Sequence, residues 1–172
     1  MDHEPLSQFH RFTVERVTYR TERGETISRD VVRHPGSVAI VPMLDDGRVC
    51  LIKNYRISVG ETLIEIPAGT LQPNETPLAC ARRELIEETG YRAAKFDQLT
   101  AFYAAPGILD EFMHLFVASG LRGGDPAREP GEQIENHIVT IDEAKSLISD
   151  GRIRDAKTMV GLLMYLQFVS QN

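Results

Sequence analysis

The chain contains several short stretches in which apolar residues alternate with polar ones or follow one another without interruption. Such stretches predict β-strands, and they occupy residues 12–19, 25–32, 37–44, 48–56, 62–66, 97–104, 112–118 and 136–141. The alternation shifts between Val14 and Val17, which predicts a bulge or bend in the first of these strands. The Asp46-Gly47 pair predicts a tight hairpin turn, because it tolerates the positive φ angles of such turns.

Residues 77–89 have the pattern of a helix with defined ends. Thr76 is a suitable N-cap, Pro77 suits the first helical position, and Gly90 is a typical stop. One stripe of this helix is apolar and is expected to pack on a sheet; it consists of Leu78, Ala81 and Leu85.

Two more helices are predicted near the C-terminus. Thr140 and Glu143 form a capping box that opens a short helix ending at Gly151. The last helix has an apolar face, made of Met159, Leu162, Leu163, Leu166 and Val169. Because strands and helices mix without strict alternation, we expect an α+β fold, with a mixed sheet in an α/β/α sandwich.

Composition excludes several classes of protein. The 172 residues are 42% hydrophobic and 26% charged, as in an ordinary folded domain. No apolar run approaches the roughly 18 residues of a membrane span, and the N-terminus lacks a secretory pattern, so we expect a cytoplasmic protein without a membrane partner. Cys50 and Cys80 are too few for a disulfide framework. The net charge of −6 argues against a nucleic-acid partner.

Three glutamates of the helix at 77–89 suggest a site for a cation. Glu84, Glu87 and Glu88 are spaced i, i+3 and i+4 and therefore lie on one face. Like charges at this spacing destabilise a helix by about 0.2–0.5 kcal/mol per pair. Arg83 offsets part of this repulsion, and a hard divalent cation would offset more. The alternative is an acidic helix face that is simply solvated.

The segment around these glutamates resembles the Nudix box. The family pattern has nine specified positions, and they correspond here to Gly69, Glu75, Arg83, Glu84, Leu85, Glu87, Glu88, Gly90 and Tyr91. Tyr91 is aromatic where an aliphatic residue is more usual. Further segments resemble the ADP-ribose pyrophosphatase branch of the family: KNYR (53–56), EIPAG (65–69), APG (105–107) with Glu111, and GRIRDAKT (151–158). Pro106, fifteen residues after the end of the box, is the marker of this branch.

This resemblance implies a fold, an activity and an assembly. The fold would be a mixed-sheet Nudix domain over residues 36–172, preceded by an antiparallel strand extension over 1–35 that pairs two subunits into a homodimer. The activity would be hydrolysis of the pyrophosphate bond of ADP-ribose or a related nucleoside diphosphate sugar, giving AMP and ribose 5-phosphate from ADP-ribose. A GDP-mannose or other nucleotide-sugar pyrophosphatase is the nearest alternative, and a non-catalytic nucleotide sensor is a remote one.

The resemblance also assigns roles within the box. It implies Mg²⁺ or Mn²⁺ ions held by a set of oxygen ligands: the backbone carbonyl of Ala68 and the carboxylates of Glu84, Glu87 and Glu88. Glu88 and Arg83 are expected to serve catalysis, Arg83 by orienting the glutamates. Gly69 would let the loop backbone approach the metal closely.

A general base and substrate contacts complete the expected site. Residues 120–135 are rich in Gly, Pro and charge, which predicts a long loop of a kind that is often functional. In similar pyrophosphatases a glutamate of this loop is the base; Glu132 is our choice, with Glu129 and Glu135 as alternatives. The residues expected to bind substrate are Arg56, Glu65, Gly107 and Glu111.

Overall fold

The computed structural model of the chain describes residues 1–124, 126–127 and 133–169. One sheet has the order β7-β4-β9-β8 and contains β7 (Ala68–Thr70), β4 (Ser37–Pro42), β9 (Phe112–Arg122) and β8 (Arg92–Tyr103). A second sheet, of order β10-β5-β6, contains β10 (Ile134–Val139), β5 (Val49–Arg56) and β6 (Glu61–Glu65). A third, of order β1-β2-β3, contains β1 (Asp2–Gln8), β2 (Thr13–Arg20) and β3 (Thr26–Arg33).

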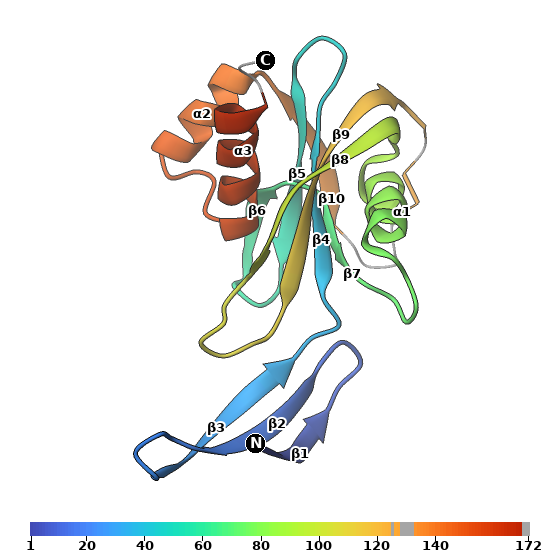
Figure 1. The fold of residues 1–172 in the computed structure, drawn as a ribbon. Helices are drawn as coiled ribbons and strands as arrows, with labels where there is room; N and C mark the ends of the chain where they lie inside the picture. Colours follow the sequence, from blue (N-terminus) through green and yellow to red (C-terminus); the bar gives the residue numbers. More distant parts are fainter. Residues whose placement is uncertain (125, 128–132, 170–172) are drawn as a thin grey trace.

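Helices cover the first two sheets from opposite sides (Figure 1). Helix α1 (Pro77–Thr89) lies on one side, and α2 (Ile141–Ser149) and α3 (Ala156–Phe168) lie on the other. Strand β4 runs parallel to β9 and antiparallel to β7, so this sheet is mixed. The expected α+β class and α/β/α sandwich are thereby confirmed. None of the helices in the described ranges is long and apolar enough to cross a membrane.

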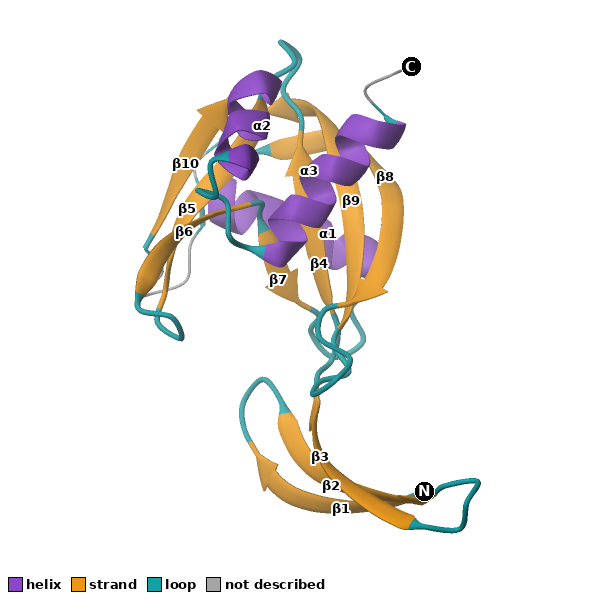
Figure 2. Ribbon diagram, turned by 90° about the vertical axis from the view of Figure 1, so that its left-hand side faces the viewer, coloured by secondary structure: helices purple, strands orange, loops and turns teal. Residues whose placement is uncertain are grey.

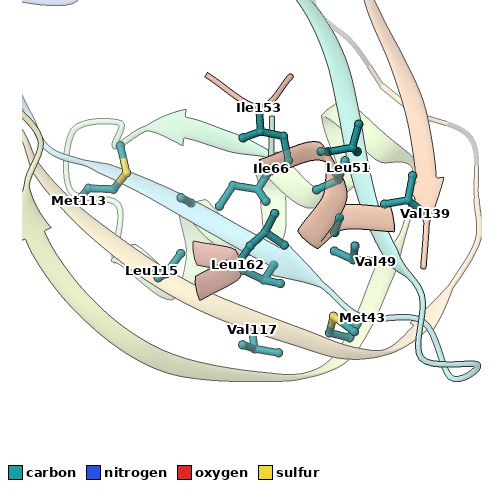
Figure 3. Close-up of a cluster of buried hydrophobic side chains, with 14 residues drawn as sticks. Met43, Val49, Leu51, Ile66, Met113, Leu115, Val117, Val139, Ile153 and Leu162 are labelled. Atoms are coloured by element: carbon teal, nitrogen blue, oxygen red, sulfur yellow. The ribbon is translucent and has the colours of Figure 1, made fainter. Parts of the chain in front are cut away.

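Strand β4 is buried on both faces, which explains its uninterrupted apolar sequence. Val38 and Ile40 belong to the apolar cluster beneath α1. Ala39 and Val41 belong to the larger cluster beneath α2 and α3, in which Leu162 of α3 is fully buried (Figure 3). The two helical layers therefore share this strand as their common support.

The strands differ from the predicted ones in several ways. Strand β7 was not predicted, because its three residues are too few to form a pattern and it forms by pairing with β4. Strand β1 was not predicted, because its sequence DHEPLSQ is polar and it forms only by pairing with β2. Strand β8 begins earlier than expected, at Arg92, and β9 runs on to Arg122. The bulge predicted within residues 12–19 is wrong, because β2 and β3 pair without a break; the register shift lies in β1, between Pro5 and Ser7.

Two leucines face solvent although the helical patterns place them in the core. Leu78 of α1 is 40% exposed, and the fully buried Cys80 packs instead beside Ala81 and Leu85. Leu163 of α3 is 52% exposed, because it lies about 100° around the helix from the buried Leu162. The apolar faces of both helices are thus narrower than the sequence suggests.

The N-terminal sheet stands apart from the body of the molecule (Figure 2). Several of its large apolar side chains, or those of its turns, are exposed: Leu6, Phe9, Phe12 and Tyr19. Its link to the body is the contact between β3 and residues 105–111. There the Val32 N–H donates to the Ile108 carbonyl at 2.9 Å, and Arg33 pairs with Asp110 at 3.0 Å. The extension therefore holds one loop of the body but has no helix packed against it.

Candidate active site

Helix α1 carries the three box glutamates and is fixed at both ends. The Thr76 hydroxyl accepts a hydrogen bond from the Ala79 N–H, and Pro77 begins the helix. Gly90 ends it with a φ of 78°, a left-handed conformation that glycine adopts without strain. The helix ends predicted from the sequence are confirmed. They fix the position of the glutamates along α1, which packs on β4 and β7.

Arg83 is the centre of the charged cluster. Its Nε and Nη2 donate to the two carboxylate oxygens of Glu75 at 2.9 and 2.8 Å. Its Nη1 donates to Glu84 at 2.6 Å and to Glu87 at 2.9 Å. The contact with Glu75, followed by those with Glu84 and Glu87, raises the pKa of Arg83 against the opposing effect of burial. The single positive charge of Arg83 thus neutralises part of the negative charge of these three carboxylates.

Glu75 is the loop acid of the box and is held in place by Arg83. The hydrogen bonds from Arg83, and a further one from the Gln72 N–H, lower the pKa of Glu75 to about 2. Glu75 therefore remains ionised under all ordinary conditions and keeps the guanidinium in a constant orientation.

Gly69 lies directly against Glu84. A Cβ atom at this position would lie 1.8 Å from the Glu84 carboxylate carbon, so no other residue fits without moving that side chain. Beside it, the Ala68 N–H donates to the buried Glu88 carboxylate at 3.0 Å. The structure therefore brings Ala68 and Gly69 of β7 next to Glu84 and Glu88 of α1, four of the residues that the sequence singles out.

Arg56 and Glu65 meet across the β5-β6 pair. The Arg56 Nε and Nη2 donate to the two Glu65 oxygens at 2.8 and 2.6 Å, and Lys157 donates to one of them at 2.6 Å. Burial acts to raise the pKa of Glu65, but these two cations together hold it below its usual value. The Glu65 side chain is 1% exposed, whereas that of Arg56 is 37% exposed. Direct contact of Glu65 with substrate stays a prediction, and the geometry favours a supporting role.

Glu111 and Gly107 belong to the loop held by the N-terminal extension. The Ser37 hydroxyl donates to Glu111 at 2.7 Å, and the His34 ring nitrogen lies 4.0 Å from the same carboxylate. A Cβ at Gly107 would meet nothing within 4 Å, so this position is open.

Described residues on both sides of residues 128–132 form hydrogen bonds with α1. The Ala127 N–H donates to the Glu87 carbonyl at 3.1 Å, and the Asn136 side chain donates to the Thr89 carbonyl at 2.9 Å. Glu129 and Glu132 lie outside the described residues. Glu135 is described; it lies on β10, 3.8 Å from Lys53, and its side chain is 73% exposed.

The oxygen-rich donor set suits a hard cation in its chemistry. Within the described ranges, however, no three His, Cys, Asp or Glu side chains are already grouped around a common point. Glu84 and Glu87 are paired with Arg83, and Glu88 accepts from the Ala68 backbone. The carboxylates of α1 therefore lie close to Gly69, and in this structure Arg83 is the cation that pairs with Glu84 and Glu87.

Sequence reasoning missed a group of residues at the start of α3. Lys157 donates to Glu65, and Thr158 accepts a hydrogen bond from the Ile66 N–H at 2.8 Å. Asp155 accepts from both Lys157 and Thr158. The only available signal was the GRIRDAKT segment, which resembles the branch but suggests no role for single residues.

The family is decided by comparison with known proteins. The profile described as NUDIX domain matches residues 33–160, which include the whole charged cluster. The chain belongs to the Nudix family.

Relatives of this Nudix hydrolase include pyrophosphatases of two kinds. It is 40% identical over 146 residues to the ADP-ribose pyrophosphatase of Bacillus subtilis, covering 84% of this chain and 78% of the relative. It is 32% identical to the GDP-mannose pyrophosphatase of Cronobacter sakazakii, covering 91% and 88% of the two chains. The crystal structure of an ADP compounds hydrolase has the same fold, with a TM-score of 0.86 at 22% identity over 99% of this chain and 93% of that one.

We predict that Glu75 contributes pH-dependent stability. Because its pKa is lowered from 4.5 to about 2, its contribution is fully present above pH 4.5 and is lost as the pH falls towards 2. In Glu75→Gln the free energy of unfolding should be lower at pH 7 and should fall less steeply between pH 4.5 and 2. Urea denaturation over this range measures both effects, with Glu22→Gln in an exposed turn as the control. Parallel curves for wild type and Glu75→Gln would contradict the prediction.

Proposed function

We propose that this Nudix hydrolase cleaves the pyrophosphate bond of ADP-ribose, releasing AMP and ribose 5-phosphate. The observation that carries the proposal is the cluster in which Arg83 joins the box carboxylates beside Gly69. The relative named ADP-ribose pyrophosphatase, at 40% identity, supports the choice of substrate. A GDP-mannose pyrophosphatase is the second candidate, supported by a relative at 32% identity. A non-catalytic sensor is disfavoured, because all nine box positions are present.

The proposed reaction depends on a divalent cation, as Nudix hydrolases generally do. We assign its ligands to the Ala68 carbonyl and the carboxylates of Glu84, Glu87 and Glu88, an oxygen donor set that suits Mg²⁺ or Mn²⁺. When bound, such a cation supplies positive charge to the pyrophosphate oxygens and activates water for attack. It would also reconcile an anionic substrate with a chain of net charge −6.

The chain's own residues bind and orient the substrate in this proposal. Arg83 holds Glu84 and Glu87 on one side, so that their carboxylates keep a defined direction. Arg56 is fixed by Glu65 through two of its nitrogens and is partly exposed, which suits it to bind a nonbridging phosphate oxygen. Gly107 and Glu111 are assigned to the ribose side, where the open backbone at Gly107 leaves room for a ligand.

We assign the general base to Glu132. A base must lie within hydrogen-bonding reach of the attacking water. Glu132 lies in the sequence between Ala127 and Asn136, which both form hydrogen bonds with α1. Glu129 shares the loop and is the first alternative. Glu135 is less suited, because it lies on β10 close to Lys53.

We further propose that the extension, residues 1–35, joins two copies of the chain. Its sheet is a single layer, and an isolated sheet needs a covering surface to bury its apolar side chains. Phe9 and Phe12 contact each other with ring centroids 4.8 Å apart and remain 53% and 38% exposed. A second copy would supply the missing cover.

Loss of one box carboxylate should abolish turnover without unfolding the protein. In Glu88→Gln the side chain keeps an oxygen that can accept from the Ala68 N–H, but it loses the charge needed to hold a cation. We expect kcat to fall by at least about 100-fold at saturating Mg²⁺, with an unchanged circular dichroism spectrum. The control is Asp142→Asn, an exposed carboxylate of α2. Turnover near the wild-type level in Glu88→Gln would remove this site from the mechanism.

The substrate is tested by direct competition between the two candidates. With ADP-ribose and GDP-mannose assayed side by side at one Mg²⁺ concentration, we expect kcat/KM to be higher for ADP-ribose. Chromatography should identify AMP and ribose 5-phosphate as its products. The opposite ratio would make the protein a GDP-mannose pyrophosphatase with the same catalytic cluster.

The assembly is tested by light scattering at micromolar concentration. We expect a mass twice the 19.3 kDa of one chain. The double variant Phe9→Asp/Phe12→Asp should have the mass of one chain, because charged side chains there oppose burial of the sheet. A wild-type particle of 19.3 kDa would show that the extension does not pair subunits.

A further inference from the structure

The start of α3 contains the most completely buried polar side chain of the described chain. Thr158 has no exposed surface. Its hydroxyl donates to Asp155, the N-cap of the helix, and accepts from the Ile66 N–H at 2.8 Å. The Thr158 N–H also donates to Asp155 at 3.0 Å, which is ordinary helix capping. The contact with Ile66 is not required by the helix, because it reaches a backbone group 92 residues away.

Ile66 begins a short segment that leads to the proposed metal ligand. The next residue, Pro67, accepts from the Ile40 N–H at 2.9 Å, and the Ala68 N–H then donates to Glu88 at 3.0 Å. Three consecutive residues are thus each held by a different element: α3, β4 and α1. Thr158 supplies the hydrogen bond from α3, and the Ile66 side chain also packs in the apolar cluster that contains Leu162.

Lys157, the neighbour of Thr158, connects α3 with Arg56 through Glu65. Its Nζ donates to Glu65 at 2.6 Å and to Asp155 at 3.0 Å, and its side chain is 11% exposed. Glu65 in turn holds Arg56 through both carboxylate oxygens. Two positive and two negative side chains therefore form one chain of contacts from α3 to the partly exposed Arg56.

We propose that Thr158 and Lys157 are positioning residues that serve opposite ends of the active site. Thr158 orients the segment containing the Ala68 carbonyl, and Lys157 orients Arg56 through Glu65. This inference rests on the proposed function, because it takes Ala68 and Arg56 as ligands of cation and phosphate. Substitution of Thr158 should then change the Kd for the cation, whereas substitution of Lys157 should change the KM for the substrate.

The first test separates the role of Thr158 in cation binding from its role in helix capping. Thr158→Val keeps the shape but leaves the Ile66 N–H without its acceptor, whereas Thr158→Ser keeps the hydroxyl. Mn²⁺ binding is measured by electron paramagnetic resonance without substrate. We expect the Kd for Mn²⁺ to rise about tenfold in Thr158→Val and to return close to wild type in Thr158→Ser. If Thr158→Val does not fold, Thr158→Ala makes the same measurement.

The second test concerns Lys157. In Lys157→Met the Glu65 carboxylate loses one of its two cations, and Arg56 loses a fixed partner. We expect KM for ADP-ribose to rise about tenfold, as for a lost hydrogen bond to a charged group, while the Kd for Mn²⁺ stays within about twofold of wild type. Thr158→Val should show the reverse pattern, with the larger change in the Kd for Mn²⁺.

Thermal midpoints distinguish a positioning role from a structural one. If Thr158→Val is less stable than wild type but binds Mn²⁺ with the same Kd, Thr158 only supports the fold and the proposal is overturned. If Lys157→Met changes kcat, KM and the Kd for Mn²⁺ together, the separation into two ends is wrong. Two outcomes are independent of the α3 variants: full turnover in Glu88→Gln would remove the proposed cation site from the mechanism, and failure of the wild type to hydrolyse ADP-ribose would refute the proposed function.

Discussion

Repulsion between carboxylates on one helix face is the constraint around which the site is organised. Glu84, Glu87 and Glu88 share one face of α1, and Glu75 faces them from the preceding loop. Arg83 neutralises part of this charge by contacting three of the four groups. The remaining negative charge makes the cluster a good receptor for a cation and a poor one for a bare phosphate. A catalyst for pyrophosphates can be built here only with additional positive charge.

The layered core holds the backbone segment that lies beside the carboxylates. Strand β4 is buried on both faces, with α1 on one side and α3 on the other. The segment from Glu65 to Gly69 lies where side chains from both helices reach it, Glu88 from α1 and Thr158 from α3. The packing that stabilises the fold therefore also determines the direction of the backbone at the site. In the proposed mechanism, stability and catalysis therefore depend on the same strands.

Local patterns allowed a large part of this arrangement to be predicted. The ends of α1 and the common face of its glutamates depend on neighbouring residues, and the sequence indicates them directly. The mixed sheet depends on the distant pairing of β4 with β9 and was expected from the mixture of strands and helices. The burial of Glu65 could not be predicted, because Arg56 and Lys157 meet it from two different elements, one of them 92 residues away. Strand β1 was likewise missed, because pairing with β2 rather than its own composition makes it a strand.

The cluster at the start of α3 has a consequence for how such a protein can change during evolution. Arg56 and Lys157 carry two positive charges, and Glu65 and Asp155 carry two negative ones, so the group is neutral as a whole. Loss of any one member would leave an opposite charge in a largely buried place, which is more harmful than losing the entire group. Substitution at one position alone is therefore disfavoured, and we expect the four residues to be retained together or replaced together.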